Sequence, residues 1–256
     1  MRRPIPLIAL TLAALVFGPI AEAKPAKHRP KRPRKVLEGA FADSKSFAYG
    51  ALDRTACLAE LKKRKVAFSE VQEARGVAIP IRLKGPLGGV TYRTELPPAE
   101  RPTTPYEVMD CRLLLALDDL SVILVKHDIE EALIFSAWRP PAKSWPKDKA
   151  ATRHPGGLAI DIRRFVKKKV GSEKARDLII ERDWAPALNQ DGCSAPQKAK
   201  LDKGDKGADA RELREIFCTA RDERIFTSML SPNYDRAHHN HFHFEITPNV
   251  SWRLVL

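Results

Sequence analysis

Four of the seven histidines of this chain lie close together near its C-terminus, in the segment AHHNHFHFEI. Side chains alternate along a strand, so His241, His243 and Glu245 are expected to share one face. The intervening phenylalanines would then enter the core from the other face. Such a strand packs with one side and offers imidazoles from the other, for metal binding or proton transfer. The alternative is a histidine-rich surface strand.

A second group of reactive side chains lies upstream, in residues 152–162, TRHPGGLAIDI. His154 lies in a glycine-bearing loop before a predicted strand, and Asp161 lies on that strand between two isoleucines. A carboxylate in an apolar strand costs free energy unless it is paired or bound to a metal. Two imidazoles and one carboxylate, with water as fourth ligand, are typical of a catalytic zinc site. The alternative for Asp161 is that it accepts N–H groups in a turn.

These two segments together resemble a known family. Residues 152–161 are similar to the S-x-H-x-x-G-x-A-x-D motif of D-alanyl-D-alanine metallopeptidases, with Thr152 in the serine position. With the late H-x-H, they resemble the wider lysostaphin, D-alanyl-D-alanine metallopeptidase and Hedgehog group. The closer resemblance, over roughly residues 50–247, is to the bacterial extensin-like C-terminal domain family. In that family a segment such as LSPNYDRAHHNHFHFEI ends the domain, and paired cysteines flank the metal motifs.

The resemblance implies a Zn²⁺ site with His154, Asp161 and His243 as ligands. It also implies that His241 lies beside the metal-bound water. The acidic base of the D-alanyl-D-alanine enzymes belongs to an E-x-x-W-H motif that this chain lacks. His241 is therefore the expected general base, with support from His238 or Glu245.

Two further residues have roles that the resemblance suggests and the residues alone leave open. Arg139 ends the stretch S-A-W-R, which resembles the S-G-Y-R stretch of the carboxypeptidase branch, where the arginine contacts substrate. The alternative for Arg139 is a surface ion pair. Thr152 either orients a metal ligand through a hydrogen bond or stabilises a turn.

Three functions are compatible with these motifs. The first is a zinc peptidase or amidase that acts on peptidoglycan peptides of the cell wall. The second is a catalytically silent, zinc-stabilised wall-binding module, which the missing glutamate allows. The third is a disulfide-held structural domain whose histidines bind no metal. Fold-level analogy alone does not decide among them.

The N-terminus predicts export. Two arginines precede a short apolar run, and Ala21–Ala23 supplies an A-x-A cleavage site. This order is typical of a secretory signal peptide cleaved after Ala23, over residues 1–23. The alternative, a membrane anchor, would need about 20 apolar residues. We therefore expect a periplasmic, cell-envelope or secreted protein.

The positive charge is concentrated just after this signal. The first 36 residues hold nine of the 45 Lys and Arg but one of the 32 acidic residues, so the remainder carries only +5 of the +13. Residues 24–45 are expected to form a basic, Pro-rich linker, with the stretch 24–35 disordered. It either binds anionic wall polymers or a membrane surface or serves as a plain solvated linker. Nucleic acid is an unsuitable partner for an exported protein.

Four cysteines in an exported chain favour disulfides, and none of them forms a C-x-x-C pair. Three pairings are possible. We expect Cys57–Cys111 and Cys193–Cys218, because each pair lies in one half of the chain. The second bond would tether the polar segment between residues 192 and 208.

Helices and strands are expected in blocks, not in strict alternation, which predicts an α+β domain over residues 46–256. We expect a small antiparallel sheet that carries the zinc site and is flanked by helices. Predicted helices cover 53–63, 105–126, 172–183 and 208–226, and predicted strands cover 77–83, 89–94, 132–138, 157–162 and 241–246.

Overall fold

The computed structural model describes residues 36–38, 43–169, 171, 176–184, 191–193 and 205–256. All of them belong to one compact unit, Lys35–Leu256. The predicted signal peptide and most of the predicted linker lie outside the described residues. Within the linker range, Val36–Glu38 forms strand β1, so the sheet begins earlier than the sequence suggested. No helix of the described residues is long and apolar enough to cross a membrane.

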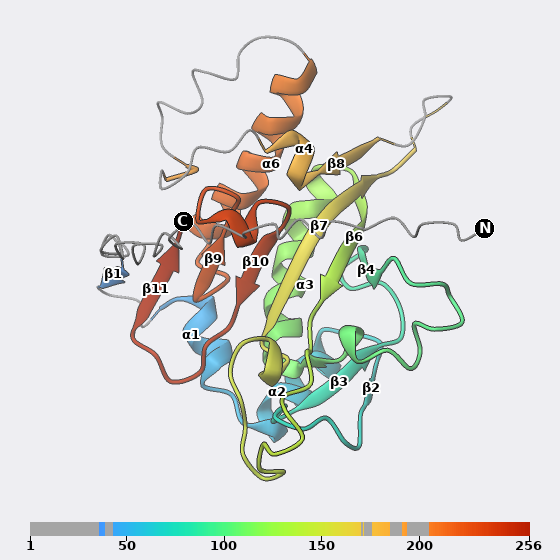
Figure 1. Ribbon diagram of the computed structural model, residues 1–256, viewed down its shortest axis with the longest axis vertical. Helices are drawn as coiled ribbons and strands as arrows, with labels where there is room; N and C mark the ends of the chain where they lie inside the picture. The colour runs from blue at the N-terminus through green and yellow to red at the C-terminus, as the bar shows by residue number, and fades with distance from the viewer. Residues whose placement is uncertain (1–35, 39–42, 170, 172–175, 185–190, 194–204) are drawn as a thin grey trace, which may run out of the picture. The chain divides into compact units, whose positions relative to one another are not determined.

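An eight-stranded mixed sheet forms the centre of this unit (Figure 1). The strand order is β1-β11-β9-β10-β7-β6-β4, and β8 pairs with β7 outside this path. Most neighbours are antiparallel, but β4 with β6 and β11 with β9 are parallel. The α+β class is therefore confirmed, whereas the expected small antiparallel sheet is too simple. The strands are β4 (Thr91–Thr94), β6 (Ile129–Ser136), β7 (Ala159–Lys167), β8 (Asp177–Ile179), β9 (Ser228–Leu230), β10 (Phe242–Glu245) and β11 (Trp252–Val255).

The helices pack against one face of this sheet, and the core lies between the two layers (Figure 1). Helix α3 is the most buried helix, and its side chains share the core with those of β6, β7, β10 and α6. Phe242 and Phe244 of β10 are fully buried there beside Phe217 of α6. The predicted inward face of β10 is thus confirmed. The helices are α1 (Lys45–Gly50), α2 (Arg54–Lys63), α3 (Cys111–Lys126), α4 (Ile180–Asp183) and α6 (Asp205–Asp222).

Helix α3 begins later than the sequence suggested. The predicted helix 105–126 opens instead with a 3₁₀ turn, Pro105–Glu107, and a short strand, β5 (Met109–Asp110). Asp110 then caps α3 by accepting the N–H of Arg112. An N-cap residue has extended backbone angles, so the helix starts after Asp110. The apolar pattern in the sequence begins earlier than the helix.

Two other predicted helices also differ in their ends. In the predicted helix 172–183, the described residues form β8 and then only the short α4, and residues 172–175 lie outside the described residues. The predicted helix 208–226 is present as α6, Asp205–Asp222. The chain leaves this helix at Arg224, which has a positive φ of 56°. The predicted helix 53–63 is present as α2, and Asp53 caps it by accepting the N–H of Ala56.

The two strands expected on either side of the turn at residues 84–89 belong to different sheets. Strand β3 (Pro80–Leu83) lies between β2 (Phe68–Glu70) and β5 in a three-stranded antiparallel sheet. Strand β4 joins the main sheet beside β6 instead. Sequence pattern identified both strands but not their partners, because pairing depends on contacts far along the chain.

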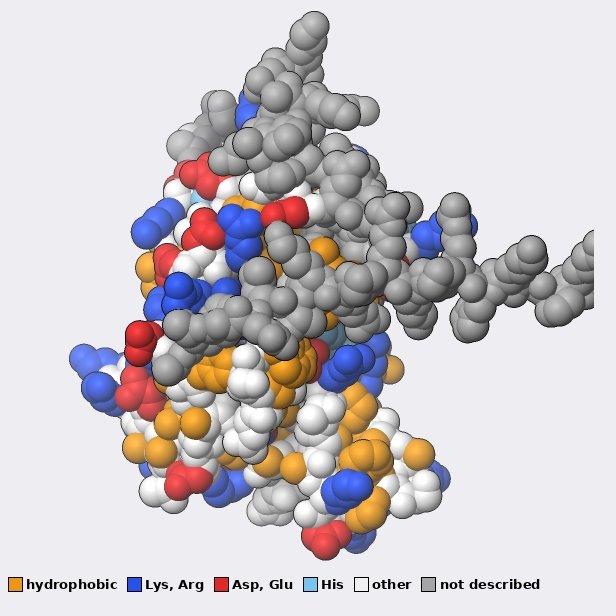
Figure 2. Space-filling model, turned by 90° about the vertical axis from the view of Figure 1, so that its left-hand side faces the viewer, with side chains coloured by type: hydrophobic (Ala, Val, Ile, Leu, Met, Phe, Trp, Pro, Cys, Tyr) orange, Lys and Arg blue, Asp and Glu red, His pale blue; other side chains and the backbone are white. Residues whose placement is uncertain are grey.

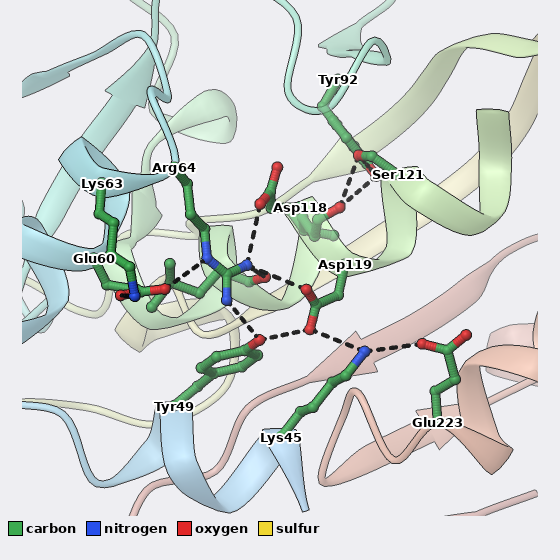
Figure 3. Close-up of polar contacts among 12 residues, drawn as sticks. Lys45, Tyr49, Glu60, Lys63, Arg64, Tyr92, Asp118, Asp119, Ser121 and Glu223 are labelled. Carbon is green, nitrogen blue, oxygen red and sulfur yellow. Dashed lines mark hydrogen bonds and ion pairs between the residues drawn. The ribbon is translucent and has the colours of Figure 1, made fainter.

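A polar network ties the first three helices together (Figure 3). The guanidinium of Arg64, just after α2, reaches Asp118 and Asp119 of α3, at 3.1 Å each. It also donates to the hydroxyl of Tyr49 in α1, which in turn donates to Asp119. Burial and the contact with Asp119 raise the pKa of Tyr49. The network therefore fixes these helices with a neutral phenol and a paired cation.

Two disulfides are present, Cys57–Cys111 and Cys193–Cys218, as the sequence analysis expected. The first joins α2 to the start of α3, and the second joins residue 193 to α6. Residues 194–204 of the segment that the second bond closes lie outside the described residues. On the face that Figure 2 shows, basic and acidic side chains are interspersed among apolar ones.

Candidate metal centre

The centre of the main sheet brings the two histidine-containing segments together. In the antiparallel pairing of β10 with β7, His243 lies opposite Asp161. On the other side of β7, Ser136 of β6 also lies opposite Asp161. These side chains face away from the core, because the neighbouring Phe242 and Phe244 face into it. The register of three strands thus determines which polar groups meet.

His154, Asp161 and His243 converge on one point, as predicted. His154 Nε2 lies 3.1 Å from Asp161 Oδ1 and 3.3 Å from His243 Nδ1. His243 Nδ1 lies 2.9 Å from the same carboxylate oxygen. His154 reaches this point from a 3₁₀ turn, His154–Gly156, in the loop before β7. All three residues are buried.

Hydrogen bonds to the ring nitrogens that face away from this point orient His154 and His243 toward it. His154 Nδ1 lies 2.7 Å from the carbonyl oxygen of Ala137, so Nδ1 carries the proton. His243 Nε2 lies 3.3 Å from Glu245 Oε2, which holds a proton on that nitrogen. In their neutral forms both rings therefore direct a lone pair at Asp161 Oδ1. A hydrogen bond to the ring nitrogen that does not bind the metal is typical of metal-binding histidines.

The donor set fits a zinc ion. Ligand atoms about 2.1 Å from a tetrahedral zinc lie roughly 3.4 Å from one another, and the three observed separations run from 2.9 to 3.3 Å. Asp161 uses its other oxygen, Oδ2, to accept from Arg139. One carboxylate oxygen and two ring nitrogens thus converge on one point.

The pKa values of Asp161 and His243 are shifted because their opposite charges lie close together. Burial alone would raise the pKa of Asp161, but hydrogen bonds from His154, His241 and His243 hold it well below its usual value. Burial likewise lowers the pKa of His243, yet Asp161 and Glu245 outweigh it and raise that pKa to about 9. Without a metal, His243 is therefore protonated at neutral pH, and a binding cation must displace this proton.

His241 lies beside the trio, as expected of the general base. Its Nε2 is 3.4 Å from Asp161 Oδ1. Its Nδ1 lies 2.8 Å from the side-chain oxygen of Asn240, so in the neutral ring the proton is on Nδ1 and Nε2 carries the lone pair. The ring is buried and packs edge-on against Phe135. His241 precedes β10, which covers residues 242–245 rather than the predicted 241–246.

The two residues expected to support His241 have different surroundings. His238 lies in a 3₁₀ turn, with its ring 5.1 Å from that of His241, and its Nδ1 contacts Asp235 at 2.7 Å. Burial lowers the pKa of His238, and Asp235 offsets part of that effect. Glu245 instead lies behind His243 and contacts the ring nitrogen away from the trio. Its carboxylate therefore orients the ring of His243.

Arg139 forms an ion pair, which was one of the two alternatives for it, although its partner Asp161 is buried. Its Nη2 donates to Asp161 Oδ2 and its Nε donates to Ser136 Oγ at 2.8 Å. The side chain is nevertheless half exposed, at 51%. It borders an open depression of about 440 Å³. The depression is lined by Tyr106, Phe135, Ser136, Arg139 and Pro140.

Within the part of the chain that the structure describes, the side chain of Thr152 makes no hydrogen bond to His154, Asp161 or His243. Its backbone carbonyl accepts the N–H of Gly156, and the carbonyl of Ala137 performs the orienting role. Sequence analysis missed Ala137, because any residue type supplies a backbone carbonyl. It also missed Asn240, although that residue lies inside the histidine segment. Of the polar segments near the site residues in sequence, 143–153 is described and most of 192–208 is not.

Comparison with known proteins gives one match. The family model described as the extensin-like protein C-terminus matches residues 142–255. This range contains the trio and both neighbouring histidines, whereas Arg139 lies just before it. No curated protein and no solved structure is similar enough to the chain to count as a match. The resemblance to the extensin-like family is thus confirmed over this range.

Proposed function

We propose that this protein is an exported, zinc-dependent peptidase that hydrolyses peptide bonds in peptidoglycan peptides. The observation that carries the proposal is the convergence of His154, Asp161 and His243 beside a histidine with an available lone pair. The ligand set, two imidazoles and one carboxylate with an open position, is that of catalytic zinc sites. The two disulfides support an oxidising compartment, as export requires.

His154 Nε2, Asp161 Oδ1 and His243 Nδ1 are the atoms that would hold the ion. A zinc ion there supplies Lewis acidity, which lowers the pKa of water and polarises a carbonyl. Arg139 withdraws charge from Asp161 through Oδ2 and leaves Oδ1 for the metal. Ala137 and Glu245 keep the imidazoles from rotating.

His241 Nε2 is the proposed proton acceptor. It takes a proton from the attacking water and returns it to the leaving amine. Asn240 fixes the tautomer that makes this possible. The exposed part of Arg139 faces the depression where substrate would lie, so its guanidinium can also stabilise negative charge on the carbonyl oxygen. Residues 24–35, outside the described residues, would add affinity for anionic wall polymers or membrane surfaces.

The test combines metal analysis with a muropeptide panel. We expect the purified protein to bind one zinc ion and to cleave one or more muropeptides. Replacing His241 by Ala should lower kcat/KM about 10²–10⁴-fold while zinc is retained. His239, an exposed histidine in the same segment, gives the matched control, and His239→Ala should cleave normally.

Two outcomes contradict the proposal in different ways. Zinc-loaded wild-type protein that cleaves nothing across a broad panel indicates a wall-binding module. A protein that takes up no metal indicates a structural domain.

A further inference from the structure

Arg153, which directly precedes His154, has a backbone conformation that is nearly reserved for glycine. Its φ and ψ are 53° and −144°. Side chains other than that of glycine are strained in this region. The carbonyl of Arg153 accepts the N–H groups of Gly156 and Leu158, at 3.0 and 2.9 Å. The turn that presents His154 therefore enforces this conformation, and glycine would satisfy it at lower cost.

The side chain of Arg153 lies at the outer edge of the candidate metal centre. It is 67% exposed, and its Nε is 3.9 Å from Glu245 Oε2. That carboxylate is already engaged, because it contacts His243 and accepts the hydroxyl of Thr247. Within the described part of the chain, the guanidinium of Arg153 makes no hydrogen bond and has this single charge contact. Its planar set of donors suits a carboxylate supplied from solution.

Arg153 and Arg139 contact different carboxylates of the site. Arg139 follows β6 and reaches Asp161, whereas Arg153 reaches Glu245 on β10, and β7 lies between these strands. The loop that ends at Arg153 adds three lysines against one acidic residue over positions 143–153. Arg153 thus ends a loop of net positive charge.

We propose that Arg153 determines specificity by binding a carboxylate of the peptide substrate on the β10 side of the site. This inference rests on the proposed function in so far as the site binds peptides. It explains why a strained position carries arginine, since the side chain serves binding and not the stability of the turn. The carboxylate comes from the C-terminus of the peptide or from an acidic side chain.

The experiment measures binding without turnover. Zinc-loaded His241→Ala protein is titrated with a peptidoglycan pentapeptide stem, with its C-terminal amide, and with a form amidated at the internal glutamate. The same titrations are made with Arg153→Gly added. We expect Arg153→Gly to raise Kd about tenfold for peptides that keep the recognised carboxylate. If amidation of one carboxylate makes the affinity independent of Arg153, that carboxylate is the one that Arg153 binds.

Thermal unfolding separates a binding role from a structural one. Arg153→Gly should raise Tm by about 2–6 °C, because it relieves strain. Arg224 gives the matched control, since it also has a positive φ, 56°, and is exposed. Arg224→Gly should raise Tm similarly and leave all three affinities unchanged.

Other results overturn the inference. A fall in Tm for Arg153→Gly, or an equal loss of affinity for free and fully amidated peptides, would assign Arg153 to the fold. Unchanged affinities with cleavage intact would reject the inference but not the proposed function. If the wild-type protein cleaves nothing but binds the peptides in a carboxylate-dependent way, the proposed function would be rejected and the inference kept. Failure to bind any of the peptides would reject both.

Discussion

Glu245 is the residue that most directly fixes a candidate ligand. Its Oε2 contacts His243 Nε2, and its Oε1 is held by the hydroxyl of Thr247 at 2.7 Å. Burial raises the pKa of Glu245, but His243 and Thr247 outweigh burial and lower it, so the carboxylate is charged. A charged, anchored acceptor orients the imidazole and strengthens it as a ligand.

Replacing Glu245 by Gln should therefore weaken zinc binding about 10–100-fold. Competition with a chelator of known affinity measures this loss. Glu181 offers a matched control, because it contacts His239 at 3.4 Å in an exposed pair. Glu181→Gln should leave zinc affinity unchanged. Equal affinities for Glu245→Gln and wild type would show that Glu245 does not support a ligand.

The stability of the metal-free protein should depend on the protonation of His243. The folded-state pKa is about 9, whereas a free histidine has about 6.5. Protonated His243 therefore stabilises the fold fully below pH ~6.5, and this contribution is lost as pH rises through about 9. The difference corresponds to a stabilisation on the order of 3 kcal/mol.

Urea unfolding of chelator-treated protein between pH 6 and 9.5 checks this dependence. We expect stability to fall across the window in wild type and in His239→Gln, whose exposed ring is the control. His243→Gln should remove most of the slope. A wild-type profile without a fall between pH 6.5 and 9 would contradict the predicted protonation of His243.

At the scale of elements, the loop before β7 positions His154 by fitting closely against the start of α3. Gly157 has a φ of 62°, and its N–H donates to the carbonyl of His154. A Cβ at this position would lie 3.0 Å from the backbone nitrogen of Asp110 and 3.2 Å from Val77. The loop therefore needs glycine both for its backbone angle and for its close approach.

Gly157→Ala should destabilise the protein by about 2–4 kcal/mol, because it adds steric overlap to backbone strain. It should also weaken zinc binding, since His154 belongs to the same turn. Gly171 has nearly the same φ, 61°, and open space around it. Gly171→Ala is thus expected to cost only about 1 kcal/mol, with zinc affinity intact. Chemical denaturation and zinc titration compare the two, and equal effects would refute the packing argument.

At the scale of the whole molecule, two disulfides close loops of different length. Cys57 and Cys111 are 54 residues apart, and Cys193 and Cys218 are 25 apart. A disulfide that closes a longer loop stabilises the fold more, because it removes more conformational entropy from the unfolded chain. The first bond is also fully buried, between α2 and α3.

Replacing Cys57 and Cys111 together by Ala should lower the free energy of unfolding by about 4 kcal/mol. The corresponding loss for Cys193 and Cys218 should be smaller, about 3 kcal/mol. Equilibrium unfolding of both double variants provides the comparison. A larger loss for the second pair would mean that loop length does not set the order.

Much of the candidate site follows from local patterns. The alternation of histidine and phenylalanine predicted which face of β10 enters the core, and Asp161 was identified because a carboxylate is costly in an apolar strand. The orienting carbonyl of Ala137 and the position of Glu245 behind His243 were not predictable. Both depend on strand register and loop path, which residue type does not encode locally.

The sequence by itself determined the reactive residue types and most of the elements near them, since periodicity and capping act over a few residues. Only the tertiary structure decided that β3 and β4 lie in different sheets and that His243 lies opposite Asp161. It also decided that a strained Arg153 borders the site. These features depend on contacts between distant segments, where many pairings have similar local preferences and packing of the whole core selects one.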